Sequence, residues 1–188
     1  GSPNIVPPWW EPPPHEVPAV LPSKAVVLGR TDHTAVFYSG AHVYTGGIEL
    51  QIERRMRHLD MDDEEWNVLG QEFMERPYRQ SEKEDRGRHY SLKFDDSSEF
   101  VALTRFRPKG DIDRPPIEYS VMRTRGGSQG DGATFASSEG LWIWPLPKGV
   151  SVVEMIFRWP AMQMVESRVQ LELPDLVGAS SRSFPLWE

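Results

Sequence analysis

Residues 140–160, GLWIWPLPKGVSVVEMIFRWP, contain two apolar segments on either side of a short turn sequence. In the second segment every other residue is large and apolar: Val153, Met155, Phe157 and Trp159. This alternation is typical of a strand that buries one face. We therefore expect residues 141–146 and 150–159 to form a hairpin whose turn is made by residues 147–149.

The first of these segments is apolar on both faces. Trp142 and Trp144 are two positions apart and so share one face, about 6.8 Å apart, while Leu141 and Ile143 occupy the other. A strand of this kind is commonly covered twice, by the opposite sheet and by something outside it. We expect the chain's own ends to supply the outer cover, through Trp9, Trp10, Phe184, Leu186 and Trp187. Two alternatives stay open: a platform for sugar rings or a proline-rich peptide, and an interface with a partner or a second copy.

Further strands follow from the same period. Residues 47–59 alternate in the same way, with Arg54 breaking the inner row, so that Arg54 is expected to reach a rim or pair with a carboxylate. Turn residues between apolar segments predict that residues 24–31 pair with 33–40, and that 90–94 pair with 99–106. The remaining expected strands are residues 117–124 and 164–173, the latter with Val165, Val169, Leu171 and Leu173 in one row.

One segment has helical spacing instead. In residues 60–76, Trp66, Leu69 and Phe73 recur at helical intervals, and acidic residues crowd the first turn. Residues 125–140 are rich in glycine and are expected to form a long loop. That loop lacks the Lys-Ser/Thr pair of a phosphate-binding loop.

Together these patterns predict a mainly β fold: an antiparallel β-sandwich, immunoglobulin-like or jelly-roll-like, with one short helix and extended Pro-rich terminal arms. The chain has 188 residues, which suits one domain. We expect residues 1–2 to be a tag scar, 3–22 a Pro/Trp-rich arm with eight prolines, 23–173 a single sandwich domain, and 174–188 a C-terminal tail packing on the body.

Composition argues against several classes of function. The formal net charge of −7 disfavours nucleic acid as a partner. No apolar segment is long enough to span a membrane. The absence of cysteine excludes disulfides, thiolate metal sites and cysteine nucleophiles, and favours a cytoplasmic location. A protein partner or self-association is the remaining expectation.

Catalytic and metal motifs are not found, so we assign no catalytic residues, no metal ligands and no cofactor. The five histidines have no metal-ligand spacing, and residues 60–71 lack the glycine and the final glutamate of a calcium loop. No G-x-S-x-G motif is present. A site assembled from loops stays open, with Asp32, His33, His89 and Asp131 as its candidates.

Three stretches carry a resemblance: PPWWEPP at residues 7–13, the segment 140–173 that begins GLWIWPLPKG, and FPLW at residues 184–187. Together they resemble a group of small uncharacterised proteins from actinobacteria that share a Pro-Trp N-terminus and a W-x-W-P-L-P hairpin. The resemblance implies a cytoplasmic bacterial source and transfers no activity.

The sequence therefore leaves three hypotheses of function. The first is a non-enzymatic protein-binding or adaptor β-sandwich. The second is a carbohydrate- or small-ligand-binding sandwich that uses a tryptophan platform, and the third is a hydrolase or metal-dependent enzyme with the loop-assembled site. The candidate binding residues are Trp9, Trp10, Trp142, Trp144 and Trp187.

Overall fold

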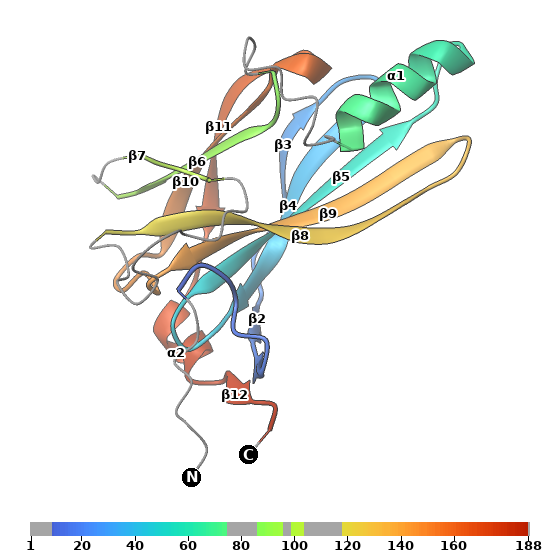
Figure 1. Ribbon diagram of the computed structural model, residues 1–188. Helices are drawn as coiled ribbons and strands as arrows, with labels where there is room; N and C mark the ends of the chain where they lie inside the picture. The colour runs from blue at the N-terminus through green and yellow to red at the C-terminus, as the bar shows by residue number, and fades with distance from the viewer. Residues whose placement is uncertain (1–8, 75–85, 96–98, 104–117, 188) are drawn as a thin grey trace, which may run out of the picture.

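The computed structural model describes residues 9–74, 86–95, 99–103 and 118–187, and they form two antiparallel sheets that face each other (Figure 1). The larger sheet has the order β2-β4-β5-β9-β8, and β3 also pairs with β4. Its strands are β2 (Ala19–Leu21), β3 (Val26–Arg30), β4 (Thr34–Val43), β5 (Ile48–Arg57), β8 (Ser120–Gly130) and β9 (Thr134–Trp144). The predicted antiparallel β-sandwich is thus confirmed.

The smaller sheet has the order β11-β10-β6-β7. Its strands are β6 (His89–Phe94), β7 (Glu99–Val101), β10 (Val152–Trp159) and β11 (Met164–Glu172). A separate two-stranded ribbon joins the two ends of the chain, β1 (Glu16–Val17) and β12 (Phe184–Pro185). The helices are α1 (Asp63–Met74), the 3-10 turn η2 (Pro160–Met162) and α2 (Leu176–Ser180).

The core lies between the sheets and is built by the alternation seen in the sequence. The inner residues of β5 and β10 are almost fully buried: Ile48, Leu50, Ile52, Met56, Val153, Met155, Phe157 and Trp159. The other residues of β5, apart from the buried Arg54, point outward and are charged or polar, so buried and outward-facing side chains alternate along this strand. Burial of these side chains from both sheets is the main stabilising term of the fold.

Helix α1 forms for the reasons expected. The Asp62 carboxylate accepts a hydrogen bond from the Glu65 N–H at 2.8 Å and caps the first turn, where acidic residues also suit the helix dipole. Trp66 and Phe73 are buried on one face. Trp66 stacks between the rings of His58, at 4.7 Å, and Phe135, at 4.9 Å, which fixes the helix over one end of the larger sheet.

The expectation of a long loop at residues 125–140 is wrong. β8 and β9 continue through most of this segment as one hairpin with a turn at 131–133, and a bulge lies between Arg125 and Ser128. The Asp131 carboxylate closes the turn by accepting from the N–H groups of Ala133 and Thr134 at 2.7 and 2.9 Å. Glycine is required in the strand itself, because a Cβ on Gly126 would lie 2.0 Å from the Ser138 carbonyl oxygen.

The expected hairpin across residues 141–159 is also wrong. β9 pairs with β5 and β8 in the larger sheet, whereas β10 pairs with β6 and β11 in the smaller one. The segment 145–151 therefore crosses between the sheets. Turn residues between two apolar strands mark a change of chain direction, both in a hairpin and in a crossing between sheets. They do not specify which strands pair.

The expected inner row of β11 is wrong at one position. Val165 is 86 % exposed, whereas Met164 is buried. A bulge in the pairing of β10 with β11, between Phe157 and Trp159, shifts the register and turns Val165 outward. Leu171 and Leu173 are buried as expected.

Candidate binding surfaces

The outer face of the larger sheet carries an aromatic slot, which we define by Tyr44, Met122, Trp142 and Trp144. Trp142 lies between Glu49 of β5 and Met122 of β8 in the strand register. The ring of Tyr44 meets the Trp142 ring edge-on, with centroids 5.5 Å apart. Burial, followed by the nearby carboxylates of Glu49 and Glu16, raises the pKa of Tyr44 to about 12.

The N-terminal arm covers this slot. The indole N–H of Trp142 donates a hydrogen bond to the backbone carbonyl of Trp9 at 2.8 Å, and Trp142 is only 1 % exposed. The rings of Trp9 and Trp10, both half-buried, are T-shaped with centroids 5.6 Å apart. Trp142 therefore offers no free face for a sugar ring, and the arm supplies the expected outer cover.

The C-terminal tail contacts the N-terminal arm and the turn that follows Tyr44. In the β1–β12 ribbon Val17 pairs with Phe184, and the Leu186 N–H donates to the His15 carbonyl at 2.7 Å. The Ser183 hydroxyl lies 3.0 Å from that of Thr45, in the turn between β4 and β5. Phe184, Leu186 and Trp187 are each at least half exposed, and that they help to cover Trp142 and Trp144 stays a prediction.

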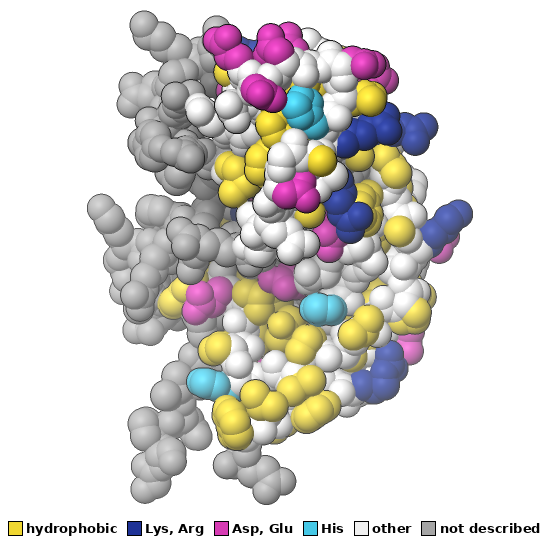
Figure 2. Space-filling model, turned by 90° about the vertical axis from the view of Figure 1, so that its right-hand side faces the viewer, with side chains coloured by type: hydrophobic (Ala, Val, Ile, Leu, Met, Phe, Trp, Pro, Cys, Tyr) yellow, Lys and Arg dark blue, Asp and Glu magenta, His cyan; other side chains and the backbone are white. Residues whose placement is uncertain are grey.

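Large apolar side chains are exposed together at this end of the molecule. We call them the apolar end, and each is between 50 % and 70 % exposed: Val20, Val177, Phe184, Leu186 and Trp187. They lie on β2, α2 and the β12 tail, and β2 contacts α2. Figure 2 shows hydrophobic side chains gathered at the lower end of the viewed face, the end at which β12 lies in Figure 1.

Sequence reasoning singled out only Trp187 in this group as a binding residue. Val20 pairs with His42 and lies on the outer face of β2, an edge strand. Val177 projects from α2, whose Leu176 and Ala179 face the core. In the sequence, Leu176 and Ala179 are three positions apart, as on one face of a helix, and Val177 falls outside that face. This spacing is the signal that could have predicted the exposure of Val177.

A cluster of charged groups is buried between the sheets around Glu139. Its carboxylate accepts hydrogen bonds from the Arg88 guanidinium at 3.1 Å and from Arg123 at 3.0 Å, and it also accepts from the Tyr90 hydroxyl. Arg54 donates to the Phe73 carbonyl and to the Ser137 hydroxyl. Arg54 does not reach a rim, since it is buried beside this cluster.

The electrostatics of the cluster favour an ionised glutamate. Burial raises the pKa of Glu139, but the charges of Arg88, Arg123 and Arg54 together outweigh it and hold that pKa well below its usual range. Burial and the adjacent Glu139 carboxylate raise the pKa of Tyr90, which stays protonated and donates. This arrangement is buried and hydrogen-bonded to the Phe73 carbonyl, so it joins α1 to both sheets and does not form an open site.

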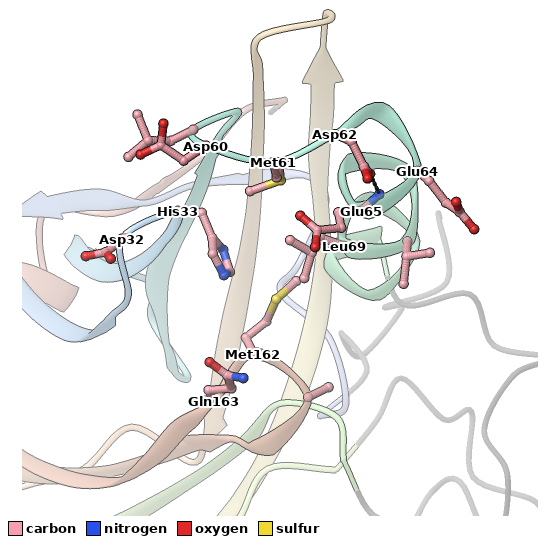
Figure 3. Close-up of a pocket in the computed structure, with 13 residues that line it drawn as sticks. Asp32, His33, Asp60, Met61, Asp62, Glu64, Glu65, Leu69, Met162 and Gln163 are labelled. Atoms are coloured by element: carbon pink, nitrogen blue, oxygen red, sulfur yellow. Dashed lines mark hydrogen bonds between the residues drawn. The ribbon is translucent and has the colours of Figure 1, made fainter.

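A hollow of about 620 Å³ lies between the β3–β4 turn, the N-terminal part of α1 and η2 (Figure 3). We call it the acidic hollow. Its apolar lining comes from Leu59, Met61, Val68, Leu69, Ala161 and Met162, and its carboxylates are Asp32, Asp60, Asp62, Glu64 and Glu65. The His33 ring points into it, and its Nδ1 lies 2.6 Å from the Thr34 hydroxyl. Burial lowers the pKa of His33, and Asp32 partly opposes that shift.

A second hollow, of about 740 Å³, adjoins the first on the outer face of the larger sheet. We call it the basic hollow, because Arg30, Arg55 and Arg57 line it and all three are exposed. Asp32 and His33 line both hollows. Figure 2 shows acidic side chains at the upper end of the viewed face and basic side chains just below them.

The structure gathers only part of the loop-assembled site that the sequence left open. Asp32 and His33 lie in the two hollows, and the Asp131 carboxylate is engaged by its own turn. His89 lies on β6 in the other sheet and lines neither hollow. Among the described residues no group of three His, Asp or Glu side chains is placed to hold a metal ion.

No family model matches this sequence, and no curated protein or solved structure is significantly similar to it. The resemblance to the actinobacterial group therefore stays a prediction. In the part of the chain that the structure covers, no helix is both long and apolar enough to cross a membrane.

Proposed function

We propose that this chain is a non-enzymatic protein-binding β-sandwich whose apolar end contacts the partner. The observation that carries the proposal is the grouping of five large apolar side chains, each at least half exposed, on β2, α2 and the β12 tail. Single apolar residues on a surface are ordinary, but several around one end are typical of a protein interface.

The aromatic slot has a supporting role in this proposal. It anchors the arm at Trp9, and the arm pairs with the tail through β1 and β12. The tail is therefore held by backbone hydrogen bonds while its side chains stay free. Ordering these residues before the partner arrives lowers the conformational entropy lost on binding.

The chemistry of the surface indicates the kind of partner. Trp187 and Phe184 are the residue types that fill pockets at the centres of protein interfaces. We expect a protein with an apolar pocket or groove. A bacterial cytoplasmic setting accords with the absence of cysteine and with the actinobacterial resemblance.

Affinity capture with a matched pair of variants tests the proposal. Phe184→Ser combined with Leu186→Ser and Trp187→Ser removes the three side chains that the tail contributes to the apolar end. Val165→Ser on β11 removes an exposed apolar side chain elsewhere. We expect both proteins to stay folded by circular dichroism, because all the substituted side chains are exposed. A protein captured from the host by the wild type should be retained by the Val165 variant and lost by the triple variant.

Equal capture by all three proteins would contradict the proposal. Light scattering separates the two classes of partner, because self-association through the apolar end would give a dimer that the triple variant abolishes.

A further inference from the structure

The acidic and basic hollows are side by side on one surface. Both are lined by Asp32 and His33, so the β3–β4 turn is their common border. The lining of the acidic hollow includes five carboxylates and, among these residues, no Lys or Arg. The basic hollow presents three guanidinium groups against Asp32 and Glu53.

The arginines of the basic hollow are held in place within the chain. Arg57 donates from Nε to the Asp32 carbonyl at 2.7 Å, and Arg55 lies over the Phe37 ring at 5.3 Å and 3.8 Å from Glu53. Arg55 and Arg57 are exposed. Charged groups that are already oriented lose less conformational freedom when a partner binds.

We propose that a second copy of this chain docks on this surface about a twofold axis close to Asp32 and His33. A twofold axis at the border of two unlike patches lays the acidic hollow of each copy on the basic hollow of the other. Both contacts are then complementary, and the same pairing occurs twice. The contact would also cover Leu59 and Val68, apolar lining residues that are 40 % and 57 % exposed.

Charge also sets the salt dependence of this dimer. The net charge of −7 makes two copies repel each other over long distances, but at physiological ionic strength this repulsion is screened beyond about 8 Å. Direct pairs across the contact act at shorter range and decide the outcome. The dimer should therefore be present at moderate salt and weaken as salt rises further.

The proposal is independent of the proposed function, because the two surfaces lie at opposite ends of the molecule: α1 borders the acidic hollow, and β12 belongs to the apolar end (Figure 1). A dimer of this kind leaves both apolar ends free. It would bind a partner with two sites more tightly than one copy does, through effective concentration.

The test uses two charge-reversed chains. Arg55→Glu with Arg57→Glu makes both hollows net negative. Asp60→Lys with Glu64→Lys and Glu65→Lys leaves only Asp32 and Asp62 as carboxylates in the acidic hollow, so both hollows of that chain are net positive. Each chain alone should dimerise about a hundredfold more weakly than the wild type, because like charges then face each other. Mixed in equal amounts they should form a heterodimer, since every contact between the two different chains is again of opposite sign.

Sedimentation equilibrium at moderate and high salt is the measurement. Lys148→Glu and Glu99→Lys, at exposed positions outside both hollows, are the controls and should dimerise as the wild type does. A wild type that stays monomeric at moderate salt, or a mixture of the two reversed chains that forms no heterodimer, would overturn the proposal.

Discussion

Trp142 and Trp9 are 133 positions apart in the sequence and are joined by a hydrogen bond of 2.8 Å from the indole N–H to the backbone carbonyl. The bond makes the arm part of the fold. It also explains why a strand that is apolar on both faces is stable here, since Tyr44, Met122 and the arm cover its outer side.

Trp142→Phe should lower the free energy of unfolding by about 1–3 kcal/mol, because it removes the donor and leaves the Trp9 carbonyl without that partner. Urea unfolding followed by circular dichroism measures the change. Trp187→Phe is the matched control and should stay within about 0.5 kcal/mol of the wild type, because its side chain is exposed. Equal effects of the two substitutions would show that the bond to the arm contributes nothing.

Gly126→Ala should destabilise the β8–β9 hairpin by about 1–3 kcal/mol, because the added methyl would meet the Ser138 carbonyl oxygen at 2.0 Å. Gly127 is the neighbouring control, since a Cβ there would have nothing within 4 Å. Gly127→Ala should leave the urea midpoint unchanged or slightly higher. If Gly126→Ala matched its neighbour, the hairpin would not have the described register.

Glu139→Gln should cost about 3–5 kcal/mol, because it removes the carboxylate from buried arginines. Glu154→Gln breaks the more exposed pair with Arg168 and should cost less than about 1 kcal/mol. Thermal or urea unfolding of the two variants at neutral pH provides the comparison.

The contribution of Glu139 should depend on pH with a defined sign. Its folded pKa is below the ordinary value of 4.5, so ionisation stabilises the folded state above the unfolded pKa. The stability difference between the wild type and Glu139→Gln should be constant above about pH 6 and should shrink as pH falls below 4.5. A difference that grew on acidification would contradict this assignment.

His33 should titrate below the ordinary value of 6.5, because burial disfavours its charged form. Asp32→Asn should lower the pKa of His33 further, since Asp32 favours the protonated ring. The folded state then loses stability as pH falls from the unfolded value of 6.5 through the folded one. NMR titration of the His33 ring protons measures both values, and an upward shift in Asp32→Asn would contradict the described environment.

Local periodicity predicted most of the elements. β5, β10 and α1 follow from spacing alone, because each buries one face, and the fold class follows from their number and turns. The pairing of β9 and β10 could not be predicted, since strand partners are chosen by the whole core. The extent of β8 was missed because Gly126 and Gly130 are required by close contacts with Ser138 and Phe135, which only the folded chain brings near.

The binding surfaces were predicted only in part, because some of their contacts are also made only in the folded chain. The covering of Trp142 by the arm followed from a strand with two apolar faces. The position of Trp187 did not, because it depends on the pairing of β1 with β12, each two residues long. The two hollows combine residues from several elements, and sequence spacing carries no signal for such a combination.

The central claim is that the apolar end contacts a protein partner, and site-specific photo-cross-linking in cells tests it most directly. A photoreactive phenylalanine analogue at position 187 should give one discrete covalent adduct, and the same analogue at position 165 should give none. Phe184→Ser with Leu186→Ser in the same chain should abolish the adduct. Equal labelling from positions 187 and 165, or no adduct from position 187, would contradict the account.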